Sequence, residues 1–343
     1  MKKNILLTGN LGYIGTVLTE ILIKDYNIIG LDSGLYEEDI LKDEVKPTKQ
    51  IKKDIRFIED KDLNGIDYVI HLAALSNDPL GEFDPNLTKQ INYMAAKKLI
   101  DLSKKNKIER FVYISSQSMY GISKETLELD EDNSEKNPAT EYAKTKWETE
   151  KYLFSITSED FISVALRPST VFGASPRLRC DIVFNNLLAC AYTTNKIEIK
   201  SDGTPWRPVI HVRDVCSAII ACLNAPKKLI NKKSFNIGIK NGNYQVKDIA
   251  KVVEKKIPNC KIIFTGEHLV DPRSYKVSFK RILNDLKDFY KPEWNLDSGA
   301  DELIKFFDEI NFKESDFRGS KTNRISSLKE KLKKNLKKDL TFK

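Results

Sequence analysis

The sequence predicts an α/β protein in which a doubly wound parallel sheet is followed by a smaller C-terminal α/β lobe. Short β-branched and apolar runs alternate with segments of helical periodicity through the first half of the chain, a pattern typical of a parallel sheet wrapped by helices. A glycine-rich turn follows the first of these runs. The 343 residues, 41% of them hydrophobic, suffice for one large core with a smaller lobe built on it.

The expected elements follow one another in a regular order. Six strands are expected in the first half, at residues 4–8, 28–32, 50–55, 68–72, 111–115 and 162–166. Helical periodicity lies between them, at about 13–24, 85–106 and 139–157. After residue 167 the alternation gives way to a segment rich in proline, glycine and arginine. A strand in PVIHV and a helix at 212–224 then predict a return to the sheet.

The first expected strand leads directly into Gly9, Gly12 and Gly15 and then into a helical pattern. Glycine allows the backbone to turn sharply and to approach a pyrophosphate, whose charge the next helix N-terminus stabilises. The second strand ends at Asp32, where a carboxylate accepts hydrogen bonds from ribose hydroxyls and repels a 2′-phosphate. The pattern predicts a Rossmann-type domain that binds NAD rather than NADP. A tight turn followed by an exposed aspartate is the alternative interpretation.

Several ordered motifs resemble those of the extended short-chain dehydrogenases/reductases that act on nucleotide sugars, the group of the epimerases and dehydratases. The resemblance covers about residues 4–312 and rests on TGNLGYIG, DIR, HLAA, SSQSMYG, YAKTK, RPSTVFG and RPVIHVRD. The chain is similar to UDP-glucose 4-epimerases, and its SPRLR run is also similar to that of GDP-heptose 4-dehydrogenases. The resemblance implies that Asp54 and Ile55 lie against the adenine of NAD. The cofactor-binding residues that it implies are Gly9, Gly12, Tyr13, Ile14, Gly15, Asp32, Asp54, Ile55, Leu72, Ala73, Ala74, Tyr142 and Lys146.

Tyr142 and Lys146 are four residues apart on an expected helix, so both project from one face. A free phenol has a pKa of about 10 and is a poor base at neutral pH. Beside an ammonium group and the cationic nicotinamide of NAD⁺ its pKa is expected to fall, so that Tyr142 removes a proton from a sugar hydroxyl. Lys146 is also expected to hold the nicotinamide ribose. The resemblance places Ser116 at the same substrate oxygen, which makes Ser116, Tyr142 and Lys146 the expected catalytic residues.

The two residues after Ser116 distinguish between reactions of this family. In the 4,6-dehydratases that the sequence resembles, an Asp-Glu pair follows the catalytic hydroxyl, whereas Gln117 and Ser118 stand here. Neither side chain can serve as a carboxyl acid or base, which disfavours loss of water. We therefore expect a 4-epimerase that works through a transient 4-keto sugar. The alternatives are a 4-dehydrogenase or 4-ketoreductase and, from another class, a non-catalytic NAD-binding interaction protein.

Two later segments, TVFGASPRLRCD and DGTPWRP, are expected to contact the substrate. Their arginines offer a planar fork for a diphosphate, although salt bridges at the surface or between lobes are the alternative for some of them. The resemblance places Asn185, Arg207 and Arg273 near the nucleotide diphosphate. The expected substrate-binding residues are Ser116, Ser118, Arg177, Asn185, Arg207 and Arg273.

The expected domains are an NAD-binding domain at 1–166 plus 209–237, a nucleotide-sugar lobe at 168–208 plus 238–315, and a basic C-terminal tail at 316–343. From residue 320 onward nine basic residues face two acidic ones, which accounts for almost all of the net charge of +8 and argues against nucleic acid as a partner. Apolar residues three and four apart predict an amphipathic helix in the tail, at Ile325, Leu328, Leu332, Leu336 and Leu340. We expect this helix to dock on the body with its lysines in solvent; binding to a membrane surface or a polyanion is the alternative.

Other features narrow the expected setting. The chain shows no secretory signal and no apolar run of membrane-spanning length. Five cysteines without a CxxC pair and three histidines argue against a disulfide framework and a metal site. The expectation is a cytoplasmic enzyme that binds a nucleotide-diphosphate sugar and NAD, uses no metal, and forms a homodimer.

Overall fold

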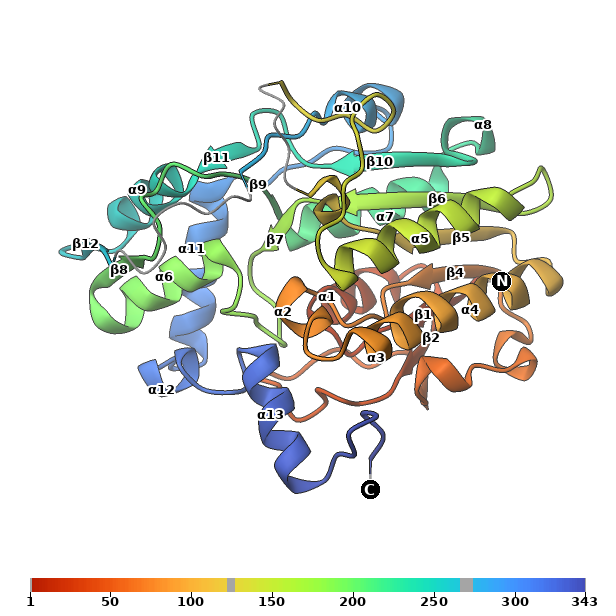
Figure 1. The fold of residues 1–343 in the computed structure, drawn as a ribbon, viewed down its shortest axis with the longest axis horizontal. Coiled ribbons are helices and arrows are strands. Elements are labelled where there is room, and N and C mark those ends of the chain that lie inside the picture. Colours follow the sequence, from red (N-terminus) through yellow and green to blue (C-terminus); the bar gives the residue numbers. More distant parts are fainter. Residues whose placement is uncertain (1, 122–126, 266–273, 343) are drawn as a thin grey trace.

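The computed structural model describes residues 2–121, 127–265 and 274–342. Its largest element is a seven-stranded sheet in the order β10-β6-β5-β4-β1-β2-β3, in which every pairing is parallel (Figure 1). The strands of this sheet are β1 (Asn4–Thr8), β2 (Asn27–Asp32), β3 (Lys49–Lys52), β4 (Tyr68–His71), β5 (Arg110–Ile114), β6 (Ile162–Pro168) and β10 (Lys233–Ile237). The predicted doubly wound parallel sheet is confirmed.

Helices cover both faces of this sheet, which explains why its strands are apolar on both sides. Ile5 and Leu7 of β1 belong to one hydrophobic core and Leu6 to the other. The covering helices are α1 (Tyr13–Leu22) and α7 (Val212–Asn224) on one face, and α3 (Pro85–Lys89), α4 (Ala96–Lys105) and α5 (Glu141–Ile156) on the other. Because β1 lies between β2 and β4, the strand order reverses at its carboxyl end, the position at which such sheets bind ligands.

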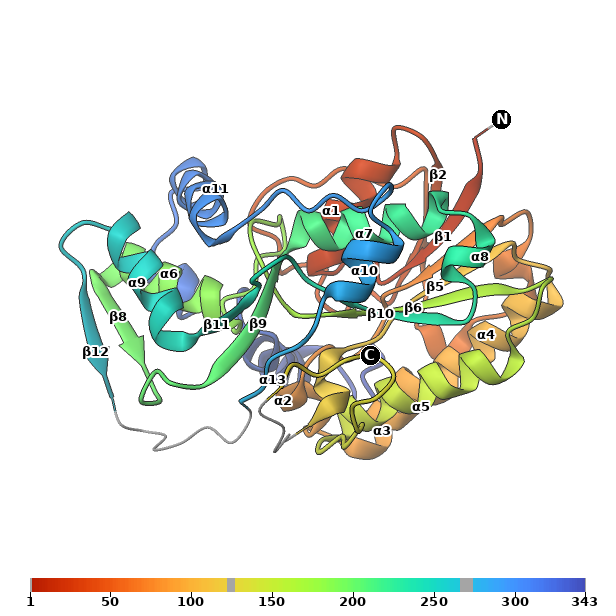
Figure 2. The same cartoon turned by 90° about the horizontal axis from the view of Figure 1, so that it is seen from above.

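A smaller lobe with two short sheets stands beside the main sheet (Figure 2). Its strands are β7 (Thr170–Phe172), β8 (Lys196–Ile199), β9 (Trp206–His211), β11 (Asn243–Gln245) and β12 (Lys261–Phe264), in the orders β11-β9-β7 and β12-β8. Its main helices are α6 (Val183–Thr194), α9 (Val246–Lys256) and α11 (Leu296–Glu309). The shorter helices of the chain are α2 (Asp78–Gly81), α8 (Lys227–Ile230), α10 (Lys280–Asp285) and α12 (Glu314–Phe317). Within the described ranges, no helix combines the length and the apolar character needed to cross a membrane.

The strand expected in PVIHV does not return to the main sheet, so this part of the prediction is wrong. It forms β9, which pairs with β7 and β11 in the smaller lobe. The physical reason is that the chain leaves the main sheet at Ser169, the single residue between β6 and β7. The strand β7 then lies outside the main sheet, and β9 pairs with it in parallel. The main sheet is rejoined one strand later, when β10 pairs with β6.

Two expected elements in the first half are interrupted. The strand expected to continue to residue 55 ends at Lys52, because the side chain of Asp54 caps the 3₁₀ turn η1 (Ile55–Phe57) by accepting a hydrogen bond from the backbone of Arg56. The helix expected over 85–106 contains the π-helical turn η3 (Gln90–Ala95) between α3 and α4. Two further 3₁₀ turns are η2 (Asp60–Leu63) and η4 (Gln117–Tyr120).

The C-terminal segment contains α13 (Arg324–Lys334) and is docked on the body of the protein. Three of its leucines, Leu328, Leu336 and Leu340, are buried in the same core as β1 residue Leu6. Its cations do not all face solvent: Arg324 and Lys331 are buried. Part of the positive charge that was expected to face solvent therefore lies in the protein interior.

Candidate active site

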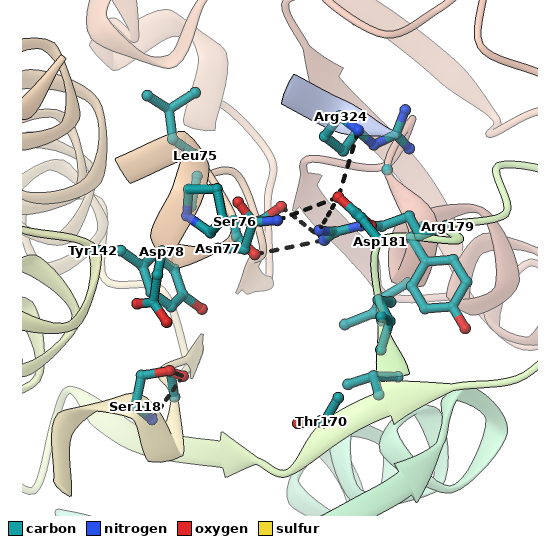
Figure 3. A pocket seen from close by; sticks show the side chains of 18 of the residues that line it. Leu75, Ser76, Asn77, Asp78, Ser118, Tyr142, Thr170, Arg179, Asp181 and Arg324 are labelled. Atoms are coloured by element: carbon teal, nitrogen blue, oxygen red, sulfur yellow. Dashed lines mark hydrogen bonds and ion pairs between the residues drawn. The ribbon is translucent and has the colours of Figure 1, made fainter. Parts of the chain in front are cut away.

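A cavity of about 980 Å³ lies at the carboxyl edge of the main sheet, with walls from both lobes (Figure 3). Its size is in the upper part of the range of small-molecule sites. All thirteen residues expected to bind the cofactor line it, and so do Ser116, Ser118 and Arg207. The cavity coincides with the reversal of strand order at β1, which is where the fold predicts a ligand.

The glycine-rich turn forms one wall of the cavity because only glycine fits its backbone. Gly9 has a φ of +75°, and a Cβ atom there would lie 2.7 Å from the backbone nitrogen of Ala73. At Gly15 a Cβ atom would lie 2.3 Å from the carbonyl oxygen of Gly9. The turn is thus packed tightly between β4 and α1, and α1 begins with its free N–H groups at the cavity, a suitable place for a phosphate.

Two carboxylates line the cavity near the ends of β2 and β3: Asp32 is the last residue of β2, and Asp54 follows β3. Asp32 accepts hydrogen bonds from the backbone nitrogens of Gly34 at 2.9 Å and Leu11 at 3.2 Å, so it also anchors the glycine-rich turn. Burial raises the pKa of Asp32, and the two N–H groups oppose this rise. Asp54 forms a salt bridge of 2.6 Å with Arg56. Both carboxylates line the cavity and are held by fixed donors.

Ser116, Tyr142 and Lys146 come from two elements and meet at the cavity wall. Ser116 follows β5 and caps η4, its Oγ accepting a hydrogen bond from the backbone nitrogen of Ser118 at 3.1 Å. Tyr142 lies in the first turn of α5, with the hydroxyl of Ser116 close enough to influence its pKa. Lys146 lies one turn further along α5, where its Nζ donates to the carbonyl oxygen of Ile114 at 2.7 Å. The end of β5 therefore positions all three side chains.

The protein's own groups do not by themselves provide the lowered pKa that is expected for Tyr142 beside Lys146 and NAD⁺. With the protein's own groups, burial raises the pKa of Tyr142, and the nearby hydroxyl of Ser116 offsets only part of this rise. Burial also lowers the pKa of Lys146 to about 7. The Nζ of Lys146 lies 5.9 Å from the centre of the Tyr142 ring, and the burial that weakens its own charge leaves it little power to favour the phenolate.

Two of the residues expected to bind substrate lie outside the cavity, and the prediction is wrong for both. Arg177 is buried in a salt bridge of 2.8 Å with Glu44, so the alternative interpretation as an interlobe pair applies to it. Asn185 is fully buried, donating to Tyr13 Oη at 3.2 Å and to the carbonyl oxygen of Arg179 at 2.9 Å. The next residue on α6, Asn186, faces the cavity instead. Arg273 lies outside the described residues.

Gln117 and Ser118, the two residues that follow Ser116, have different environments. Ser118 lines the cavity, and its Oγ accepts a hydrogen bond from Ser116 at 3.1 Å. Gln117 is buried and donates from Nε2 to the carbonyl oxygen of Arg167 at 3.0 Å. Its amide therefore connects η4 to β6.

Arg179, one of the arginines expected to pair with a diphosphate, lines the cavity together with two carboxylates that were not expected there, Asp181 and Asp78. Arg179 forms a salt bridge of 2.8 Å with Asp181 and donates to Ser76 Oγ at 3.2 Å, bridging the two lobes across the cavity (Figure 3). Asp78 lies beside Tyr142, and its Oδ1 accepts a hydrogen bond of 2.6 Å from Thr140 (Figure 3). Asp181 stands two residues after Arg179, a spacing that could have suggested their pairing. Asp78 has no comparable local signal.

The cavity fits a large polar ligand such as a dinucleotide. Among the described residues, five side chains have a buried polar atom without a hydrogen-bond partner, and four of these line this cavity: Tyr36, Ser115, Gln117 and Arg324. Buried polar groups in folded proteins are normally paired. These atoms have almost no accessible surface, so they lie behind the cavity wall, and the fit to a dinucleotide rests on the glycine-rich turn, where a Cβ atom at Gly9 or Gly15 would clash with the backbone.

Comparison with known proteins agrees with this geometry. A family model described as the NAD dependent epimerase/dehydratase family matches residues 5–238. The chain is 26% identical over 271 residues to N-acetyl-α-D-glucosaminyl-diphospho-ditrans,octacis-undecaprenol 4-epimerase of Escherichia coli O157:H7, covering 76% of this chain and 75% of that one. It is 27% identical over 281 residues to dTDP-D-glucose 4,6-dehydratase of Homo sapiens, covering 78% of each chain.

A similar fold occurs in the structure of UDP-glucose 4-epimerase of Thermotoga maritima with UDP-glucose. The TM-score is 0.77 at 21% identity, and the match covers 89% of this chain and 99% of that chain. The matched family model spans well over half of this chain and includes the glycine-rich turn, Ser116, Tyr142 and Lys146. The protein therefore belongs to the NAD-dependent epimerase/dehydratase family, and its cofactor is NAD.

Proposed function

We propose that the protein is an NAD-dependent nucleotide-sugar 4-epimerase that works through a transient 4-keto sugar. The observation that carries this proposal is that Ser116, Tyr142 and Lys146 all line the cavity, with Tyr142 and Lys146 one helical turn apart on α5. NAD, when bound, supplies the acceptance and return of a hydride at the fourth carbon. The chain's own residues supply proton transfer, orientation and binding.

In this proposal Tyr142 Oη exchanges the proton of the sugar's 4-hydroxyl. Ser116 Oγ, which lies near Tyr142 on the cavity wall, holds the same sugar oxygen, so the proton moves along a short and prearranged path. Lys146 Nζ is fixed by the carbonyl oxygen of Ile114 and has further donor capacity for a ribose hydroxyl of the cofactor. These roles require no carboxyl group next to Ser116.

Loss of water from the sugar is the main competing reaction, because relatives of this chain include a 4,6-dehydratase. Elimination needs one group that removes a proton beside the ketone and another that protonates the departing hydroxyl. Gln117 has no titratable proton, and its amide is already bonded to the carbonyl oxygen of Arg167. The carboxylate beside Tyr142 is Asp78, but one of its oxygens is engaged by Thr140. These contacts favour epimerisation.

The decisive assay incubates the protein with UDP-, GDP-, CDP- and dTDP-sugars and with a polyprenyl-diphosphate-linked sugar. We expect a C4 epimer of the same mass as its substrate, without accumulation of NADH. NADH that accumulates together with a keto product would identify a 4-dehydrogenase instead. A product lighter by one water that the Tyr142→Phe variant fails to make would identify a dehydratase, and Asp78 would then be its first candidate acid or base.

The partner molecules beyond the cofactor stay predictions. The diphosphate-linked sugar is supported by the cavity, by Arg207 on its wall and by the names of the relatives. A homodimer is supported by the sequence resemblance alone, and the mass of the protein in solution would test it.

A further inference from the structure

The C-terminal segment, residues 321–342, presents a strongly basic surface although its apolar residues are docked on the body. Figure 1 shows α13 and the end of the chain at the lower edge of the molecule. The acids that this segment exposes are Glu330 and Asp339. Six of its lysines are exposed, and we call them the basic face: Lys321, Lys329, Lys333, Lys334, Lys337 and Lys338.

Most lysines of the basic face have no counter-ion within the protein. The cations of this segment that do form ion pairs are Arg324 and Lys331, which are buried against Asp39. Because their charge is not compensated by neighbouring acids, the exposed lysines can attract an anionic partner. Among the residues that the structure describes, five lysines of the basic face form no ion pair: Lys321, Lys329, Lys333, Lys337 and Lys338.

The chain ends in a hairpin that holds two of these lysines in place. Leu336 and Phe342 form an antiparallel bridge across it. Leu336 and Leu340 are both buried in the core on one face of the main sheet. Lys337 and Lys338 lie between these two buried leucines and are exposed. The backbone that carries the two ammonium groups is therefore already ordered, which reduces the entropy lost when they contact a partner.

Two exposed aromatic rings lie beside the hairpin. Phe342 is 38% exposed, and Nζ of Lys52 lies 5.8 Å from the centre of its ring. Phe57 is 57% exposed, and the guanidinium centre of Arg56 lies 5.8 Å from the centre of its ring. Arg56 also connects Phe57 to the hairpin, because its Nη2 donates to the carbonyl oxygen of Asp339 at 2.7 Å. Large apolar side chains that remain exposed next to a charged surface are typical of interaction sites.

We propose that the basic face, together with Phe57 and Phe342, is a docking surface for an anionic lipid bilayer. The lysines contact the phosphates of anionic lipids, and the two rings enter the headgroup region. A cation already lies over one face of each ring, which argues against a nucleic acid whose bases would stack there. This surface does not depend on which reaction the protein performs on its sugar.

The first test measures co-sedimentation of the full-length protein with lipid vesicles. One set of vesicles contains phosphatidylcholine alone, and the other contains about 30% phosphatidylglycerol. We expect binding to the anionic vesicles only. Binding should weaken as the salt concentration rises from about 0.1 M to about 0.5 M, because salt screens the attraction between lysines and phosphates.

A triple variant, Lys333→Gln, Lys337→Gln and Lys338→Gln, tests whether the basic face carries this binding. Each lysine near an anionic leaflet strengthens binding by about fivefold, so we expect the triple variant to bind about ten- to a hundredfold more weakly. The matched control removes the same charge from exposed lysines of α8 and the region after α10, and it should change binding by less than about threefold. Its substitutions are Lys227→Gln, Lys228→Gln and Lys287→Gln.

Phe342→Asn tests the contribution of the aromatic rings without changing the charge. Because the ring loses contact with water when it enters the headgroup region, we expect its removal to weaken binding to the anionic vesicles by about five- to tenfold. Phe264→Asn is the matched control, since Phe264 is 55% exposed but lies on β12 of the smaller lobe. We expect this control to bind like the unaltered protein.

Three results would overturn the proposal. One is the same binding, or none, to neutral and to anionic vesicles. Another is an equal effect of the two triple variants, which would show that only the net charge of the protein matters. The third is salt-sensitive binding to single-stranded DNA without binding to anionic vesicles, which would assign the basic face to a nucleic acid.

Discussion

At the scale of single residues, burial dominates the chemistry of Tyr142 and Lys146. It raises the pKa of the phenol and lowers that of the amine to about 7, so each side chain favours its neutral form. Ser116 is the polar partner that the fold gives to Tyr142. A ligand that places a cation beside the Tyr142 phenol would lower its pKa strongly. The phenol is buried, so little water is present to screen the charge of the cation.

Tyr142→Phe tests the assignment of the base. The variant keeps the ring and loses the titrating hydroxyl, so we expect turnover to fall by about 10²–10⁴-fold, the usual contribution of a general acid–base group, with NAD affinity nearly unchanged. Steady-state rates and NAD titrations measure the two effects. Tyr152→Phe is the matched control, because Tyr152 lies on the same helix, bonds to Asp101 and does not line the cavity. A fully active Tyr142→Phe protein would place the base elsewhere.

The buried amine of Lys146 makes stability depend on pH. Its pKa is about 7 in the folded protein and about 10.5 when exposed, so between these values the unfolded chain binds a proton that the folded chain lacks. Stability from this group therefore rises as the pH rises through that window, and the full penalty remains below about pH 7. We expect Lys146→Met to be more stable than the unaltered protein near neutral pH, by up to about 5 kcal/mol, and inactive.

The measurement is urea unfolding of nucleotide-free protein at several pH values up to about 8.5. The upper limit avoids the buried thiols, because burial raises the pKa of Cys216 and Cys222 above the ordinary value of 9.0 and so lowers stability at higher pH. The gap in unfolding free energy between Lys146→Met and the unaltered protein should narrow as the pH rises. A gap that stays constant with pH would contradict the predicted titration of Lys146.

At the scale of elements, the position of α5 relative to the sheet depends on one buried ion pair. Glu150 on α5 and Arg167 on β6 are both buried, and Arg167 Nη1 also donates to Tyr120 Oη at 3.0 Å. The pair fixes the helix that carries Tyr142 to β6, the neighbour of β5, and Ser116 follows the end of β5. The spacing of the catalytic side chains therefore depends on a contact about two helical turns from Tyr142.

Glu150→Gln should remove about 3–5 kcal/mol from the free energy of unfolding, because it leaves the charge of Arg167 buried without its counter-ion. Urea unfolding measures this loss. Glu148→Gln provides the control, since Glu148 stands on the same helix and is only half-buried. Equal stability of the two variants would show that solvent or other groups compensate Arg167.

At the scale of the whole molecule, the C-terminal segment completes the core on one face of the main sheet. Leu328 is fully buried there, whereas Leu332 on the same helix is half-buried. We expect Leu328→Ala to lower the free energy of unfolding by about 2–5 kcal/mol and Leu332→Ala to lower it by less, because a larger cavity remains at the fully buried site. Urea unfolding of both variants distinguishes them. An unchanged midpoint for Leu328→Ala would show that α13 does not stay docked in solution.

The sequence by itself determined the parts of this protein that local pattern controls. The alternation of strands and helices, the glycine-rich turn and the 212–224 helix follow from hydrophobic periodicity and from the demands of backbone geometry, which act over a few neighbouring residues. The motif order determined the family, because Gly9, Asp32, Ser116, Tyr142 and Lys146 stand at recognisable separations along the chain.

The tertiary structure alone decided which side chains face the cavity. Asn185 and Asn186 are neighbours on α6, yet the helix turns the first into the core and the second toward the cavity. Arg177 forms an ion pair with Glu44, a residue 133 positions away in the sequence. Arg324 forms one with Asp39, 285 positions away. A charge in a sequence does not reveal its counter-ion, because ion pairs form between surfaces that meet only after the sheet, the lobe and the C-terminal segment have packed.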